Sequence, residues 1–137
     1  MNTWLVKSEP ESWSWQQQCD AGTTHWDGVR NFQASKHLKA MAVGDLAFFY
    51  HSGGERRIVG IVEVTRPYYP DPSDPSGRFG MVDVRAVEPM PEPVTLAAVK
   101  AEPRLAELAL VRQSRLSVMP IDEASWRLIR AMGGMKD

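Results

Sequence analysis

The chain has 137 residues, of which 43% are hydrophobic and 24% are charged, and its formal net charge at pH 7 is -1. This length suits one domain, and the apolar content is too high for an intrinsically disordered chain. The balanced charge excludes a protein that coats nucleic acid through bulk electrostatic attraction. Cys19 is the single cysteine, which excludes an internal disulfide and favours a reducing compartment. No apolar run reaches membrane-spanning length. We therefore expect a monomeric cytoplasmic domain over residues 1–137.

The first third of the sequence predicts one strand and two helices. A run rich in β-forming residues stops before Pro10, because proline cannot donate to a β-ladder. Serine and asparagine side chains that accept backbone N–H bonds then mark two helix starts. The expected elements are a strand over 4–7, a helix over 13–18 capped by Ser12, a loop over 21–24, and a helix from Asn31 to Met41.

The remainder of the chain predicts further strands and short helices. The run over 46–51 is apolar on both faces and is therefore expected at the centre of a sheet. Gly60 predicts a bulge or a close backbone approach, and the prolines within 67–77 predict a long loop. The expected elements are strands over 46–51, 57–65, 81–87 and 116–119, a proline-rich connection over 88–93, helical turns over 96–100 and around Leu105 and Leu108, and a terminal helix capped by Asp122. Because strands and helices do not alternate strictly, a mixed α+β domain is favoured over a doubly wound parallel sheet.

Three polar segments interrupt the apolar elements at strand ends and helix starts. They are KSEP (residues 7–10), WDGVRN (26–31) and YHS (50–52). Rigid elements position such side chains, and Trp26 and Tyr50 offer flat faces on which a nucleic-acid base can stack. The pattern predicts that the three segments form the rim of one binding site.

Four segments resemble the EVE family of the PUA-like superfamily, which is related to the YTH and ASCH domains. They are WLVKSEP (4–10), WDGVRN (26–31), GD with FFYHS (within 44–52) and QSRLSV (113–118), and they extend over nearly the whole chain. The resemblance implies an α+β fold, a PUA-like mixed β pseudo-barrel of about five to six strands with surrounding short helices. It also implies a non-catalytic module that holds a modified base, flipped out of its strand, in an aromatic and polar pocket. The implied partner is nucleic acid, with a modified cytosine in DNA or a modified base in RNA.

The family pocket, carried over onto the matching positions, draws on all four segments. From side-chain chemistry we expect Trp26 to stack on the base, Asn31 and Ser8 to hydrogen-bond its Watson–Crick edge, and Lys7 to contact phosphate. The implied ligand-binding residues are Lys7, Ser8, Glu9, Trp26, Val29, Arg30, Asn31, Tyr50, His51, Ser52, Ser114 and Arg115.

Several of these residues have a structural interpretation beside the functional one. Asn31 fits a helix cap as well as it fits a ligand contact. Arg115 is a candidate phosphate contact, as is Arg30, but it fits equally an ion pair with Glu9 or Asp45 inside the barrel. The residues alone leave these alternatives open.

Two other functions are alternatives to the binding of a modified base. A hydrolase acting on modified nucleotides or nucleosides would use His51 as general base, with Asp45 or Glu9 as its partner. No nucleophile elbow, phosphate loop or metal-ligand spacing accompanies His51, so the sequence predicts no enzyme, no cofactor and no metal. A protein-interaction module would use the proline-rich segments 67–75 or 89–93, which carry no clear recognition pattern.

Overall fold

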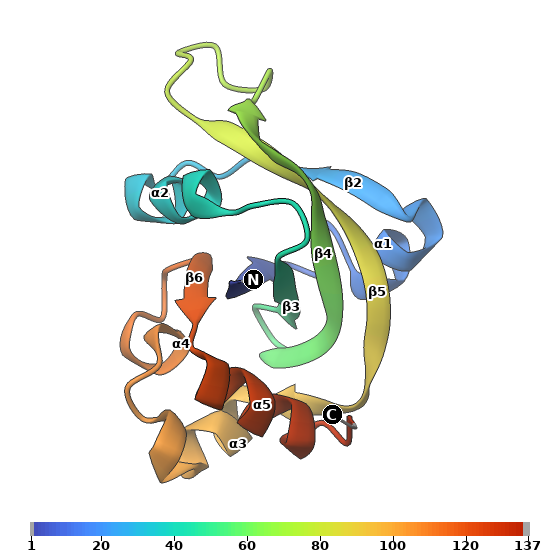
Figure 1. Ribbon diagram of the computed structural model, residues 1–137, viewed down its shortest axis with the longest axis vertical. Coiled ribbons are helices and arrows are strands. Elements are labelled where there is room, and N and C mark those ends of the chain that lie inside the picture. The colour runs from blue at the N-terminus through green and yellow to red at the C-terminus, as the bar shows by residue number, and fades with distance from the viewer. Residues whose placement is uncertain (1, 136–137) are drawn as a thin grey trace.

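The structure, a computed structural model, describes residues 2–135 and consists of one curved sheet with helices around it (Figure 1). The strands are β1 (Thr3–Ser8), β2 (Thr23–Trp26), β3 (Leu46–His51), β4 (Arg57–Pro70), β5 (Gly80–Thr95) and β6 (Val118–Ile121). The α-helices are α1 (Trp15–Ala21), α2 (Phe32–Ala40), α3 (Leu96–Ala101), α4 (Ala109–Arg112) and α5 (Glu123–Met132), and a 3-10 turn spans Pro103–Leu105. The predicted α+β class with a mixed sheet of five to six strands is confirmed.

The strand order brings the segments of the predicted site together. The six strands follow the order β2-β5-β4-β3-β1-β6, in which β1 pairs in parallel with β3 and the other neighbours are antiparallel. In the parallel pair, Lys7 lies opposite Tyr50 and Ser8 lies opposite His51. The first and third polar segments of the sequence therefore meet at one end of the sheet.

The core is built around β3, as its two-sided apolar sequence predicted. Phe48 stacks on Trp126 of α5 with ring centroids 3.9 Å apart. Phe49 meets the rings of Trp15 and Trp26 edge to face, at centroid distances of 5.4 and 5.5 Å. Successive side chains of a strand point to opposite faces, so these contacts cover both faces of β3.

The prolines do not end the long strands where the sequence predicted loops. β4 continues to Pro70, and β5 runs through the segment 88–93. The register of β4 against β5 shifts beside Gly60, and Pro91 lies in the stretch that this irregularity skips, where a missing N–H is tolerated. A Cβ on Gly60 would lie 2.5 Å from the ring of Trp15, so the predicted close approach is confirmed.

β2 occupies residues 23–26, and the loop predicted over 21–24 was wrong except at Gly22, because Ala21 ends α1. This strand forms by antiparallel pairing with β5, in which Trp26 lies opposite Val82. Such a pairing joins segments far apart in the sequence, and no local sequence signal in a four-residue strand predicts it.

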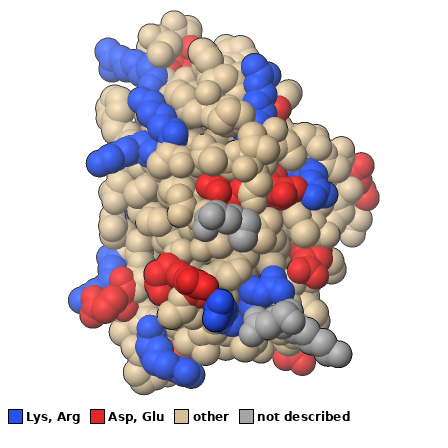
Figure 2. Space-filling view, viewed as in Figure 1, with Lys and Arg blue, Asp and Glu red and all other residues tan. Residues whose placement is uncertain are grey.

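Helix starts followed their local signals more closely. Asn31 caps α2 and Asp122 caps α5, as predicted. α1 begins after Ser14, which forms a capping box with Gln17, and the predicted cap at Ser12 was wrong. No helix among residues 2–135 is long and apolar enough to cross a membrane. On the face drawn in Figure 2, Lys and Arg side chains gather over α2 and the loop above it, whereas acidic and basic side chains are mixed around α5.

Candidate functional site

A cavity of about 560 Å³ opens where β1 and β2 end and the segments that follow them come together. β1 contributes Lys7 and Ser8, and β2 contributes Trp26 at its last position. The lining residues are Lys7, Ser8, Glu9, Ser12, Trp13, Thr24, His25, Trp26, Asp27, Gly28, Val29, Arg30 and Ser117. This mixture of aromatic and polar groups suits a planar ligand that carries hydrogen-bonding atoms.

Two tryptophans form the aromatic part of the cavity wall. Trp26 is only 7% exposed and meets the ring of Phe49, so most of its surface belongs to the core. Trp13 is half-buried and is fixed at two points. Its indole Nε1 donates to Gln18 Oε1 at 2.9 Å, and its backbone carbonyl accepts from the Ser8 hydroxyl at 2.5 Å. Trp13, which the sequence did not single out, therefore combines a fixed position with surface that a ligand can reach.

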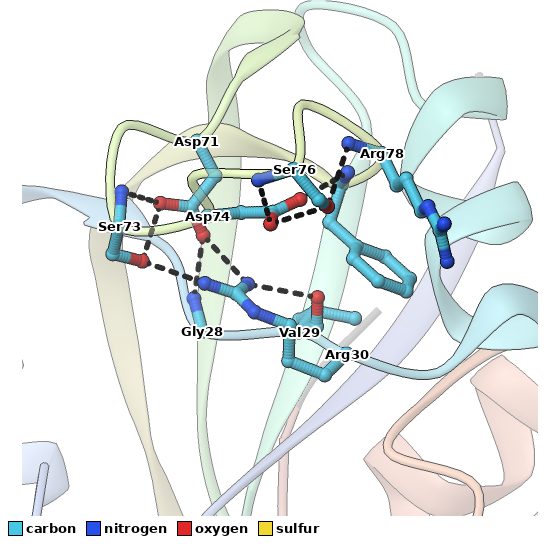
Figure 3. Close-up of polar contacts among 9 residues, drawn as sticks. Gly28, Val29, Arg30, Asp71, Ser73, Asp74, Ser76 and Arg78 are labelled. Atoms are coloured by element: carbon cyan, nitrogen blue, oxygen red, sulfur yellow. Dashed lines mark hydrogen bonds and ion pairs between the residues drawn. The ribbon is translucent and has the colours of Figure 1, made fainter.

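A buried carboxylate from the loop between β4 and β5 fixes the wall from Gly28 to Arg30 (Figure 3). Asp71 Oδ2 accepts from the Gly28 backbone N–H at 2.9 Å and from Arg30 Nη1 at 3.1 Å. Its Oδ1 accepts from the backbone N–H and the hydroxyl of Ser73 at 2.8 and 2.6 Å. Burial alone would raise the pKa of Asp71, but these hydrogen bonds outweigh it and hold that pKa well below its ordinary value. Asp71 is therefore ionised and anchors this part of the wall.

The same loop repeats an Asp-Pro-Ser turn at 71–73 and 74–76. Asp74 accepts from the backbone N–H and the hydroxyl of Ser76 at 2.9 and 2.6 Å, and from the Phe79 N–H at 2.8 Å. The bond from the Ser76 hydroxyl is the main cause that lowers the pKa of Asp74 to about 2. The Phe79 ring lies 5.7 Å from the Arg30 guanidinium carbon. The loop thus has an internal role as a support for the cavity wall.

Lys7 separates this cavity from a second hollow of about 430 Å³, and it lines both. Its ammonium group donates to the Ser114 carbonyl at 2.9 Å and lies 5.6 Å from the centre of the Tyr50 ring. Burial lowers the pKa of Lys7. The predicted site residues Tyr50, Ser52, Ser114 and Arg115 line the second hollow. All of the predicted residues except Asn31 and His51 therefore line one or both of two adjoining depressions.

His51 is 7% exposed, and both of its ring nitrogens contact other groups of the protein. Its Nε2 accepts from the Trp15 backbone N–H at 3.0 Å, and its Nδ1 lies 2.9 Å from a Glu55 carboxylate oxygen. Since a backbone N–H can only donate, the two bonds together fix the neutral tautomer with its proton on Nδ1. His51 is not among the described residues that line either hollow.

The hydrolase dyad of His51 and Asp45 is excluded by their positions. Asp45 directly precedes β3 and His51 is its last residue, so the two lie about 20 Å apart at the usual rise of a strand. Asp45 accepts from the Trp4 indole Nε1 and the Ala42 backbone N–H, each at 3.0 Å. Among residues 2–135, no group of three or more His, Cys, Asp or Glu side chains is placed to hold a metal ion.

The model of the EVE domain family matches residues 2–132. This chain belongs to the EVE domain family. The resemblance seen in the four sequence segments is thereby confirmed. Human thymocyte nuclear protein 1 is 32% identical to this EVE domain, over 94% of the chain and 72% of that protein.

Solved structures of relatives share the fold of this EVE domain. An NMR structure of a protein from Rhodopseudomonas palustris is 54% identical and has a TM-score of 0.93, with 98% of this chain and 94% of that chain covered. The crystal structure of human THYN1 in complex with DNA containing 5-methylcytosine is 31% identical, with a TM-score of 0.93 and 100% of both chains covered. An ASCH protein from Zymomonas mobilis, 8% identical with a TM-score of 0.60, shares the fold alone.

The structure places the predicted residues of this EVE domain in four locations. Asn31 caps α2 through the Ala34 N–H at 2.9 Å and borders a separate surface hollow together with Arg115. His51 lies in the interior. Tyr50, Ser52, Ser114 and Arg115 line the second hollow. The residues brought together at the cavity are Lys7, Ser8, Glu9, Trp26, Val29 and Arg30.

Sequence reasoning missed the cavity residues of β2 because it assigned that segment in part to a loop. Thr24, two residues before Trp26, and Asp27, directly after it, also line the cavity. His25 also lines it, with Nδ1 2.9 Å from the Asp83 carboxylate, which the Tyr69 hydroxyl also contacts. Alternation in a strand over 23–26 was a signal that could have placed Thr24 on the same face as Trp26.

Proposed function

We propose that this EVE domain is a non-catalytic reader that binds DNA containing a modified cytosine and holds the flipped base in the cavity beside Trp13 and Trp26. The cavity carries the proposal, because its aromatic and polar lining suits a single nucleobase removed from its stack. The human relative solved with 5-methylcytosine DNA supports it, since that chain shares the fold over its full length.

The lining also suggests how a cytosine is distinguished from a thymine. Glu9 and Asp27 are exposed carboxylates at the cavity, and a carboxylate accepts from the N4 amino group of cytosine. Thymine has no such donor. The Ser8 hydroxyl donates to the Trp13 carbonyl, so Ser8 serves as a positioning residue for the stacking surface. No chemical step belongs to the proposal, because His51 is buried with both ring nitrogens engaged.

Fluorescence-anisotropy titrations of the whole chain test the reader function. The probes are matched oligonucleotides with one central cytosine, 5-methylcytosine, 5-hydroxymethylcytosine, adenine or N6-methyladenine, as single- and double-stranded DNA and as RNA. We expect the tightest binding to duplex DNA with a modified cytosine, with a preference over plain cytosine of roughly 10- to 200-fold, the discrimination that one methyl-sized group provides. Equal affinity for all probes would overturn the reader function, and preference for a modified RNA would reassign the substrate.

A further inference from the structure

The second hollow adjoins the base cavity and shares its wall. Lys7, Glu9 and Ser117 line both depressions. On the far side of this shared wall, the turn between β3 and β4, α3 and the segment before β6 complete the hollow, through Arg56, Lys100 and Arg115. A nucleotide whose base enters the cavity therefore has its sugar-phosphate backbone within reach of this second surface.

The hollow concentrates positive charge that the protein does not neutralise. Lys7, Arg56, Lys100 and Arg115 face a single lining carboxylate, Glu9. None of the four cations forms an ion pair with a carboxylate among residues 2–135. Elsewhere most arginines are paired; the neighbour Arg57, for example, lies 3.0 Å from Glu55. An unneutralised cluster in a chain of net charge -1 is a local feature suited to an anion.

Hydrogen bonds fix the ammonium group of Lys7 and the main chain of Arg56. The Lys7 ammonium is fixed by the Ser114 carbonyl at 2.9 Å, which leaves it at the shared wall. Arg56 adopts a φ of 48°, a left-handed conformation that non-glycine residues seldom take, and its carbonyl accepts from the Leu96 N–H at 2.8 Å. Backbone strain of this kind persists where the surrounding structure imposes it, and it concentrates at functional sites. The turn that carries Arg56 is thereby tied to α3, the helix that carries Lys100.

We propose that this hollow binds phosphodiester groups of the strand whose base occupies the cavity, with Arg56, Lys100 and Arg115 as the contacting residues and Lys7 at the junction. The inference rests on the proposed function and extends it, because it assigns the backbone to a surface separate from the residues that select the base. Phosphate contacts position a protein on nucleic acid without reading sequence.

The salt dependence of DNA binding tests the phosphate site. The affinity of the wild type and of the triple variant Arg56→Gln, Lys100→Gln, Arg115→Gln for duplexes with cytosine or 5-methylcytosine is measured over a series of salt concentrations. The plot of log affinity against log salt should become shallower in the variant by about 0.9 for each phosphate group that the variant no longer neutralises. The preference for 5-methylcytosine should stay within about twofold of the wild-type value, because phosphate groups are common to both duplexes.

A matched control and three outcomes make the result decisive. Arg127→Gln removes one positive charge from the exposed face of α5, and we expect it to leave the slope unchanged. A wild-type slope in a folded triple variant would overturn the phosphate site and leave the reader function standing. Absence of a base preference in the wild type would overturn the reader function. The change in salt slope between wild type and triple variant would still decide whether the hollow binds phosphate groups. Absence of any DNA binding by the wild type would overturn both.

Discussion

Asp71→Asn is expected to lower the free energy of unfolding by about 2–4 kcal/mol, because it removes the charge from a buried carboxylate that accepts several hydrogen bonds and pairs with the exposed Arg30. The substitution keeps the shape of the side chain but removes the charge that lies 3.1 Å from Arg30. It also replaces one accepting oxygen of the carboxylate by an NH2 group, which can only donate. Either the Gly28 N–H or the N–H and hydroxyl of Ser73 therefore lose their acceptor. Urea unfolding followed by tryptophan fluorescence measures the difference.

The stability that Asp71 provides should also depend on pH in a defined direction. Its pKa in the folded protein is depressed below that of an unfolded aspartate, about 3.9. The unfolded chain therefore binds a proton more readily, and the contribution is complete above the unfolded pKa and is lost as the pH falls below it. The difference in unfolding free energy between wild type and Asp71→Asn should be constant from pH 7 to 5 and should narrow towards pH 2.

The neighbouring carboxylate of Asp27 gives a matched control for both measurements. Asp27 is exposed, and Asp27→Asn should change stability by no more than about 0.5 kcal/mol. If Asp71→Asn proved equally mild, or if its effect did not change with pH, the anchoring role of the loop would be contradicted.

Trp13→Ala is expected to weaken binding to 5-methylcytosine DNA by roughly 5- to 150-fold, which corresponds to the 1–3 kcal/mol of one stacked base. Trp13 is half-buried, lines the cavity and is held by Ser8 and Gln18, so its ring offers a fixed stacking surface. Trp26 is a less informative target, because its deep burial against Phe49 means that Trp26→Ala would also disturb the core.

A conservative variant separates stacking from folding at this position. Trp13→Phe keeps a flat aromatic face but loses the indole donor to Gln18, and it should retain most of the affinity. Circular dichroism of both variants checks the fold. Wild-type affinity in a folded Trp13→Ala protein would remove Trp13 from the proposed site.

Features that depend on neighbours in sequence could be predicted, and those that depend on distant pairing could not. The caps at Asn31 and Asp122 follow from side chains that bond to backbone three residues ahead. The strand over 23–26 needs β5 as its partner, and prolines within β5 are tolerated because the ladder is irregular beside them. Neither condition is visible in a short window of sequence.

The candidate site shows the same division. Family segments indicated six residues that the fold does bring to one cavity: Lys7, Ser8, Glu9, Trp26, Val29 and Arg30. Asp71 was missed because it acts on Gly28 from 43 residues away. The protein contacts of His51 could not be predicted, because a position at a strand end looks the same in sequence whether the ring faces a ligand or Trp15.

The most direct test of the reader function measures whether the modified base leaves its stack on binding. A duplex carries 2-aminopurine next to one 5-methylcytosine, and its fluorescence is recorded at saturating wild-type protein, at saturating Trp13→Ala protein and with an unmethylated duplex. Flipping into the cavity predicts a rise in fluorescence with the wild type and the methylated duplex that is much smaller in the other two samples. Saturated binding of the methylated duplex without any rise would contradict a flipped-base reader.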